Sequence, residues 1–293
     1  MPNLEMDYQS LGSPLGILRF AQVFLSCTSF SLVASVNMYN NPYGSWSMFT
    51  WCFCFAVTII IIVLEVTGLC RRIPISWEDF TSAFSMLATL MLFTTSIMYP
   101  STFLRGGCSG HSCACRGAAT ATSILCFFAY AAEVGLTRAK PGEVSGFLST
   151  VPGLLKVLQS YVACLIFSLI PGIPYGGLGG LQWCVAVFSI CFIFTTLIIF
   201  ITIGRLLAIL STFLEKVLIG YNILCVAMYI TVAIIWPYYN FKDNPSRPNN
   251  CQPNIRCIWD NALGVTFLAY LNLVAYIVDL VYSFKMVFIT AQA

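Results

Sequence analysis

The side chains most able to do chemistry in this chain are five charges inside long apolar stretches: Arg19, Glu65, Glu133, Lys156 and Asp279. A charge in a lipid bilayer costs roughly 2.5–3.5 kcal/mol on insertion scales, so each needs a partner or a function. A cation in the first stretch and an acid in the fourth recur in the second half of the chain. This pattern predicts structural ion pairs: Arg19 with Glu133, with Glu65 sharing the cation, and Lys156 with Asp279.

The alternative function for these charges is a path for protons or ions, because acids inside a membrane often mark one. Four amides within the apolar stretches, Gln22, Gln159, Asn222 and Asn272, could line such a path. However, the five charges all lie within about two helical turns of one end of their stretches, and no stretch is interrupted at mid-span. This placement favours the structural interpretation.

Cysteines form the second group with chemical potential, and five of the fourteen fall in expected outer loops. Cys251 and Cys257 most simply form a disulfide within their loop. Cys108 is expected to pair with Cys113 or Cys115, and the sequence leaves this connectivity open. Together with His111, these three cysteines also have the spacing of a zinc site. The short spacing and an oxidising location favour the disulfide.

The remaining candidates indicate no enzyme. His111 is the only histidine, and no nearby acid or serine completes a catalytic set around it. The glycine-rich segment 176–180 lacks the Lys-Ser/Thr that follows in a phosphate-binding loop. We therefore expect no catalytic, metal or cofactor-binding residues and no cofactor. Cys70, beside Arg71 and Arg72, is a candidate palmitoylation site.

The elements that must hold these residues are membrane helices. The chain is 59% hydrophobic and 9% charged, with mean hydropathy +0.86, whereas soluble domains are about 25% charged. A net charge of +3 without a basic patch gives no reason to expect a nucleic-acid partner. Because a spanning helix needs about 20 apolar residues, the sequence predicts an all-α membrane protein with eight transmembrane helices, at residues 16–38, 48–69, 77–100, 117–137, 151–171, 180–204, 214–237 and 258–287.

Basic residues predict the orientation of these helices. Cytoplasmic N- and C-termini place nine Lys and Arg residues on the inner side and five outside, in agreement with the positive-inside bias. The predicted organisation is a cytoplasmic tail at 1–15, a first four-helix unit at 16–138, a cytoplasmic linker at 139–150 and a second four-helix unit at 151–293.

The two units read as tandem copies. Residues 17–27 (ILRFAQVFLSC) return as residues 154–164 (LLKVLQSYVAC), and the cation and glutamine stand three residues apart in both. Three further landmarks recur in the same order. These are Trp51-Cys52 as Trp183-Cys184, Ile97–Pro100 as Ile234–Pro237, and Ala129-Tyr130 with Glu133 as Ala275-Tyr276 with Asp279.

The chain resembles tandem MARVEL domains, and their arrangement is similar to that of the myeloid-associated differentiation marker family. The resemblance rests on the duplication, the segment 75–80 (ISWEDF), the exit at Tyr99-Pro100 and the acid Glu133. It implies two four-helix MARVEL-like bundles. It also implies association with cholesterol-rich lipid bilayers, lateral membrane-protein partners or self-association, and a place in the plasma membrane.

Three functions are compatible with these observations. The leading hypothesis is a non-enzymatic multi-pass plasma-membrane protein that organises ordered membrane domains (rafts), trafficking or cell-junction and adhesion behaviour. A small-solute or ion transporter or channel is the second. Internal repeats are common in transporters, but repeats of four helices run in the same direction and create no inverted symmetry. The third is a cell-surface receptor that uses the two large outer loops.

Overall fold

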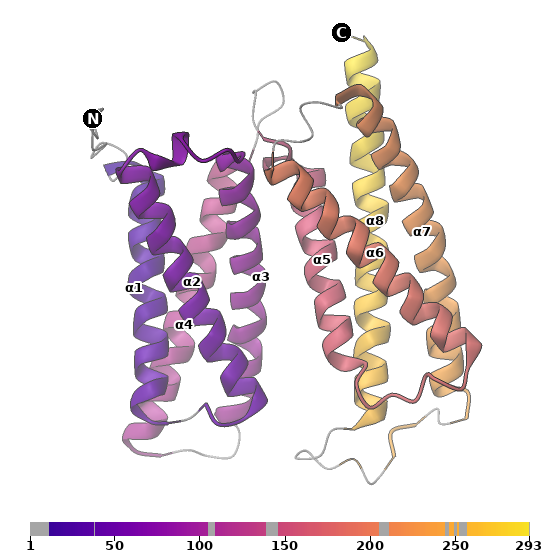
Figure 1. Cartoon of the computed structure of the whole chain (residues 1–293). Coiled ribbons are helices and arrows are strands. Elements are labelled where there is room, and N and C mark those ends of the chain that lie inside the picture. The colour runs from indigo at the N-terminus through magenta and orange to yellow at the C-terminus, as the bar shows by residue number, and fades with distance from the viewer. Residues whose placement is uncertain are drawn as a thin grey trace. The chain divides into compact units, whose positions relative to one another are not determined.

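The fold is helical throughout its regular elements. The computed structural model describes residues 12–37, 39–104, 109–138, 146–204, 211–243, 246–248, 251 and 257–292, with backbone only for 211–216 and 286–292. Eight of its helices are long and apolar enough to cross a membrane, as the sequence predicts. They are α1 (Pro14–Ser35), α2 (Pro42–Val66), α3 (Trp77–Phe103), α4 (His111–Thr137), α5 (Val151–Leu169), α6 (Gly179–Ile203), α7 (Ser211–Phe241) and α8 (Ile258–Gln292), shown in Figure 1.

Three helices begin on the same local signal, a capping side chain followed by a proline in the first turn. Ser13 accepts a hydrogen bond from the amide of residue 16 before α1, at 3.1 Å. Asn41 and Thr150 cap α2 and α5 in the same way, at 2.6 and 3.3 Å. Proline suits these positions because the first amides of a helix have no partner within it. The starts of these helices are therefore determined locally.

Three helices end later than the sequence analysis predicts: the eighth, predicted to end at residue 287, continues to Gln292, and two others continue past a proline. Pro100 was expected to end the third helix, but α3 continues to Phe103, and Pro237 likewise lies inside α7. Both prolines stand in the last turns, where losing one backbone hydrogen bond is tolerated when neighbouring helices support the segment.

The fourth helix starts six residues earlier than predicted, so residues 111–116, which the predicted helices leave in a loop, are helical. Gly110 has a positive φ of 81°, which lets the chain turn immediately before α4. The Arg116 guanidinium then donates to the carbonyl oxygen of Phe103 at 3.0 Å and so ties the start of α4 to the end of α3. As a result Cys113 and Cys115 are helical residues.

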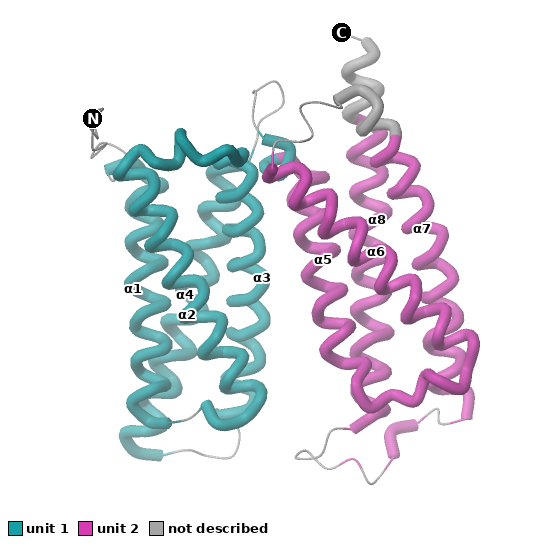
Figure 2. The backbone as a smooth tube through the Cα atoms, viewed as in Figure 1, with its two compact units in different colours: residues 1–149 teal, residues 150–293 magenta. Residues whose placement is uncertain are grey.

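The helices form two compact units, residues 1–149 and 150–293 (Figure 2). In unit 1, α1 packs mainly against α2 and α4, and α3 packs against the same two helices. In unit 2, α5 and α7 each pack against α6 and α8. Unit 1 also contains the 3-10 turn η2 (Leu69–Arg71) after α2 and the 3-10 turn η3 (Phe147–Ser149), which packs on α3.

The cores of the two units repeat the same aromatic contacts, 137 positions apart. Phe30 and Phe55 make an edge-to-face contact at 5.4 Å in unit 1, and Phe167 and Phe192 make it at 5.6 Å in unit 2. Deeper in each core, the Trp51–Tyr99 contact at 5.3 Å corresponds to Phe188–Trp236 at 5.8 Å. Edge-to-face packing is a preferred geometry for aromatic pairs, so these contacts fix how the helices meet.

This register corrects one landmark of the sequence analysis. Trp51 is fully buried and corresponds to Phe188, whereas Trp183 is 45% exposed. The pairing of Trp51-Cys52 with Trp183-Cys184 is therefore wrong. The shared Trp-Cys letters are coincidental, because an offset of 132 residues rather than 137 rotates the helix to a different face.

Candidate functional site

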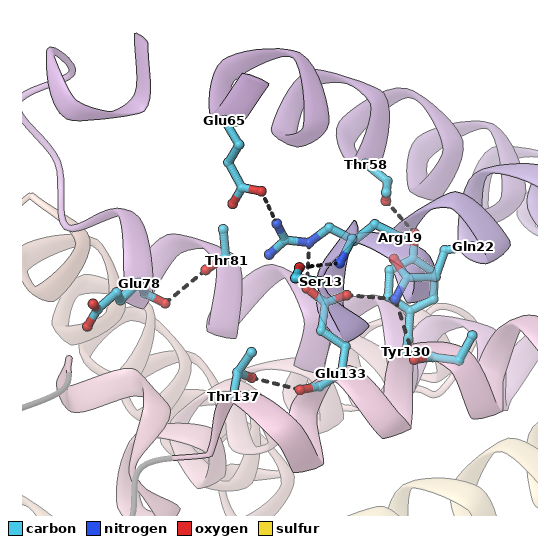
Figure 3. Close-up of polar contacts among 12 residues, drawn as sticks. Ser13, Arg19, Gln22, Thr58, Glu65, Glu78, Thr81, Tyr130, Glu133 and Thr137 are labelled. Carbon is cyan, nitrogen blue, oxygen red and sulfur yellow. Dashed lines mark hydrogen bonds and ion pairs between the residues drawn. The ribbon is translucent and has the colours of Figure 1, made fainter. Parts of the chain in front are cut away.

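The most densely connected polar site in unit 1 surrounds Arg19. Its guanidinium Nε donates to Glu133 Oε1 at 3.0 Å, and its Nη1 makes an ion pair with Glu65 Oε2 (Figure 3). Gln22, one turn further along α1, donates to Glu133 Oε2 at 2.6 Å and to the carbonyl oxygen of Ala129 at 3.4 Å. The cluster thus joins α1, α2 and α4.

Helix ends explain why these residues meet. Arg19 lies in the second turn of α1, Glu133 in the last turns of α4 and Glu65 at the end of α2, and these ends adjoin because successive helices alternate in direction (Figure 1). Trp77, the first residue of α3, donates its indole N–H to Glu65 Oε1 at 2.9 Å. All four helices of the unit therefore contribute, and every oxygen of the two carboxylates has a partner.

Unit 2 contains a corresponding cluster around Lys156. Its Nζ lies 2.7 Å from Asp279 Oδ2 and also donates to Asn222 Oδ1. Gln159 donates to Asp279 Oδ2 at 2.9 Å and to the carbonyl oxygen of Ala275 at 3.4 Å, so it repeats the two contacts of Gln22. Lys156 and Asp279 are both almost fully buried.

Two tyrosine rings complete the surroundings of the buried ammonium group. Lys156 Nζ lies 5.2 Å from the ring centre of Tyr221 and 5.5 Å from that of Tyr276. These are cation–π distances, and such contacts strengthen when the cation is removed from water. Tyr276 in turn hydrogen-bonds Thr195 at 2.9 Å, as Tyr130 hydrogen-bonds Thr58 in unit 1.

The clusters share a cation, a glutamine and an acid but differ in their third partner. In unit 1 this partner is the acid Glu65 on α2, whose position in the second copy is taken by Thr202. In unit 2 it is the neutral Asn222 on α7, whose position in the first copy is Ser85. With carboxylates ionised, the first cluster has a net charge of −1 and the second is neutral. The additional negative charge of the first cluster is tolerated because the Glu65 side chain is 24% exposed.

The chemistry that this geometry supports is attachment of helices to one another. Replacing a buried ion pair with apolar residues is often neutral, but removing one partner leaves an uncompensated charge and is strongly destabilising. Each of the four amides that could have lined a path makes side-chain hydrogen bonds in or beside these clusters, and the Gln22 Oε1 and Asn272 Oδ1 atoms have no partner among the described residues. Asn272, for example, donates to Tyr229 OH at 2.8 Å and to the carbonyl oxygen of Gln159 at 3.4 Å.

The cysteines divide into paired and free ones. Cys251 and Cys257 form a disulfide, Cys113 is disulfide-bonded and Cys115 is free. Cys108 lies outside the described residues. Near the first of these disulfides, Arg247 makes a bidentate ion pair with Asp260 at 2.9 and 2.8 Å, and this carboxylate raises the pKa of Arg247.

Neither His111 nor Cys70 has the surroundings of a reactive centre. His111 Nε2 lies 3.5 Å from Cys115 Sγ, one turn along α4. Among the described residues, no group of three or more His, Cys, Asp or Glu side chains could hold a metal ion. Cys70 lies in η2, is partly exposed and has a free thiol.

Sequence reasoning missed two partners in this region, Trp77 and Asp79. The indole N–H of Trp77 donates to Glu65. Asp79 is 95% buried and accepts a hydrogen bond from the amide of Leu148 at 2.6 Å. The available signal was the pair of acids at the start of a membrane helix, which is expensive unless it is bound to something.

Comparison with known proteins agrees with the duplicated architecture. The chain matches the MARVEL membrane-associating domain twice, over residues 10–136 and 147–282. It is 42% identical to the mouse "Myeloid-associated differentiation marker" over 96% of this chain and 92% of that protein. The human protein of the same name is also 42% identical, over 98% and 92% of the two chains.

A third relative has a different name. The human "Myeloid-associated differentiation marker-like protein 2" is 41% identical over 94% of this chain and 93% of its own. No solved structure matches the chain. The identities and the double domain match place this multi-pass membrane protein in the myeloid-associated differentiation marker family of MARVEL-domain proteins.

Proposed function

We propose that this protein is a non-enzymatic organiser of ordered plasma-membrane domains, acting through its lipid-facing helix surfaces and through lateral partners or self-association. Such a role would take part in trafficking, cell-junction or adhesion behaviour. In this proposal the two units are four-helix bundles in the plasma membrane, with both termini cytoplasmic.

One observation carries the proposal: the charged groups within the helices are directed inward and paired, while large side chains exposed on the helix surfaces are apolar. The charged clusters around Arg19 and Lys156 are buried and partnered. Large exposed side chains on the same helices are apolar, for example Phe24 at 70%, Phe200 at 67% and Phe267 at 66% exposure. In a bilayer this surface meets lipid tails, so the parts of the described helices available to other molecules are those that sort lipids and neighbouring helices.

The first test is the partitioning of purified, labelled protein between liquid-ordered and liquid-disordered phases in giant vesicles that contain cholesterol. We expect enrichment in the ordered phase. Exclusion from that phase would contradict the organiser proposal. Ion and solute flux in proteoliposomes would then test the transport alternative.

A matched variant tests how the protein enters the ordered phase. Protein from mammalian cells carries any lipid attached to Cys70, and Cys70→Ser removes the attachment site. If acylation drives sorting, this variant loses enrichment, while Cys164→Ser, which changes an exposed thiol within α5, keeps it. Equal enrichment of all three proteins would assign sorting to the helix surfaces.

The proposed orientation of the termini can be tested by antibody labelling. Epitope tags placed before residue 1 and after residue 293 should be labelled by antibodies only in permeabilised cells. Labelling of intact cells at either end would overturn the proposed cytoplasmic termini.

A further inference from the structure

The first turn of α3 contains two acidic residues that take no part in the charge clusters. Ser76 precedes the helix, and Glu78 and Asp79 lie in its first turn. Acids are favourable at this place because the first amides of a helix carry partial positive charge. Capping alone does not account for Asp79, however, since one of its oxygens accepts from Ser76 Oγ at 2.6 Å and the other faces a different segment of the chain.

That segment is the end of the connection between the two copies, residues 146–149. The amide of Leu148 donates to Asp79 Oδ1 at 2.6 Å, and the amide of Gly146 donates to Glu78 Oε2 at 3.3 Å. The hydroxyl groups of Ser82 and Ser149 lie 2.8 Å apart. Leu148 is fully buried, so an apolar anchor accompanies the three polar contacts.

Gly146 fits this place for a steric reason. A Cβ atom added to it would overlap the Asp79 carboxylate, with both oxygens and the carbon of that group in the way. Its backbone can therefore approach the acid only because the side chain is absent. The sequence pairs a glycine in the linker with an acid on α3.

The second copy lacks this combination. At the 137-residue offset that relates the two cores, Asp79 corresponds to Lys216 and Ser82 to Ile219. A lysine cannot accept a hydrogen bond from a backbone amide, and an isoleucine offers no hydroxyl. Glu78 corresponds to another acid, Glu215, so the Asp79 and Ser82 contacts are the ones particular to the copy that precedes the linker.

We infer that Glu78, Asp79 and Ser82 form a binding surface for residues 146–149 of the same chain, a linker clamp. Trp77 holds Glu65 in the Arg19 cluster, and the next two residues hold the linker. Consecutive side chains of the ISWEDF segment therefore connect the charge cluster to the chain that leads into the second copy. The bound segment ends at Ser149, and the next residue, Thr150, is the N-cap of α5.

Hydrogen–deuterium exchange of the full-length protein in lipid nanodiscs tests the clamp. In the wild type, the amides of residues 146 and 148 should exchange slowly. Gly146→Ala and Asp79→Ala should each accelerate amide exchange in the peptide that contains residues 146 and 148 by about tenfold or more, because a hydrogen bond to a carboxylate is lost. Gly135→Ala is the matched control, since a Cβ at Gly135 meets no atom within 4 Å.

Gly146→Ala lies outside every helix, so its effect separates loss of the clamp from unfolding of α3. A cysteine pair gives a second readout. Ser82→Cys with Ser149→Cys should cross-link under mild oxidation, and the linked peptides should be identified by mass spectrometry. Fast exchange at residues 146 and 148 in the wild type would overturn the clamp. So would unchanged exchange in both variants, or failure of the cysteine pair to cross-link.

Discussion

At the residue scale, the molecule places each buried cation among acids and amides that leave little of it unpaired. Arg19 contacts Glu65 and Glu133, and Lys156 contacts Asp279, Asn222 and two tyrosine rings. A guanidinium can bond two carboxylates in different directions, whereas an ammonium is a compact charge that fits an aromatic cage. Arginine thus suits the first copy, where the third partner is the carboxylate of Glu65, and lysine suits the second, where the third partner is the neutral Asn222.

Removing one member of the first pair should be costly. We expect Arg19→Ala and Glu133→Ala each to lower the free energy of unfolding by about 3–5 kcal/mol, because each leaves a buried charge without its partner. Exchanging the two residues, Arg19→Glu with Glu133→Arg, should recover part of the loss. The measurements are thermal unfolding in detergent and surface expression. Arg247→Ala breaks an exposed pair and should change little; indistinguishable behaviour of all these variants would remove the pair from the account.

The third partner should matter less than the acid of the main pair. Glu65→Gln is expected to lower stability by about 1 kcal/mol, because the carboxylate is partly exposed and Arg19 keeps Glu133. Trp77→Phe removes the indole that bonds Glu65 and should have an effect of similar size. Unfolding curves of the two single variants and the double variant form a cycle that measures their coupling. Strict additivity would argue against the indole–carboxylate contact.

At the element scale, the duplicated helices use one register with different side chains. Thr50 on α2 and Thr95 on α3 are fully buried, and their hydroxyl oxygens have no hydrogen-bond partner among the described residues. At the equivalent positions of α6 and α7, the second copy has Val187 and Val232, both fully buried. Valine, which has nearly the same shape as threonine, therefore fits these positions in the second copy without a polar group.

This comparison predicts that Thr50→Val and Thr95→Val stabilise the protein, each by about 1 kcal/mol or more, because an unpartnered buried hydroxyl costs free energy. The reverse changes, Val187→Thr and Val232→Thr, should lower the melting temperature. Thermal unfolding of the four single variants in the same detergent makes the comparison. A loss of stability in the two valine variants would mean that the hydroxyls have partners in the membrane.

At the scale of the whole molecule, each compact unit contains its own charge cluster and its own aromatic core. The Arg19 contacts lie within residues 1–149 and the Lys156 contacts within 150–293. The cores are likewise separate sets of residues. The determinants of stability described for one copy thus do not require the other.

A fragment of residues 1–149 tests this independence. We expect it to insert and fold in membranes, and Arg19→Ala should destabilise it by the same amount as in the full chain. Size-exclusion chromatography and thermal unfolding provide the measurements. Loss of the Arg19→Ala effect in the fragment would show that the cluster depends on the second copy.

Much of the fold was predictable because its causes are local. Apolar stretches of spanning length mark the eight helices. A capping residue with proline stands at three of their starts, but the sequence analysis did not use this signal and predicted the second helix to begin at residue 48, whereas α2 begins at Pro42. The same patterns miss where α3 ends and α4 begins. Those limits depend on the tie between Arg116 and the end of α3, a contact between residues that local patterns do not relate.

By itself, the sequence determined the membrane class, the duplication, and which cations and acids need partners, because lipid penalises every unpaired charge wherever the chain goes. Only the tertiary structure decided that Asn222 is the third partner in the second copy, that Trp51 corresponds to Phe188, and that Asp79 holds the linker. Each of these depends on which faces of the helices meet. The choice among faces is made by packing over the whole unit, which no single stretch of sequence contains.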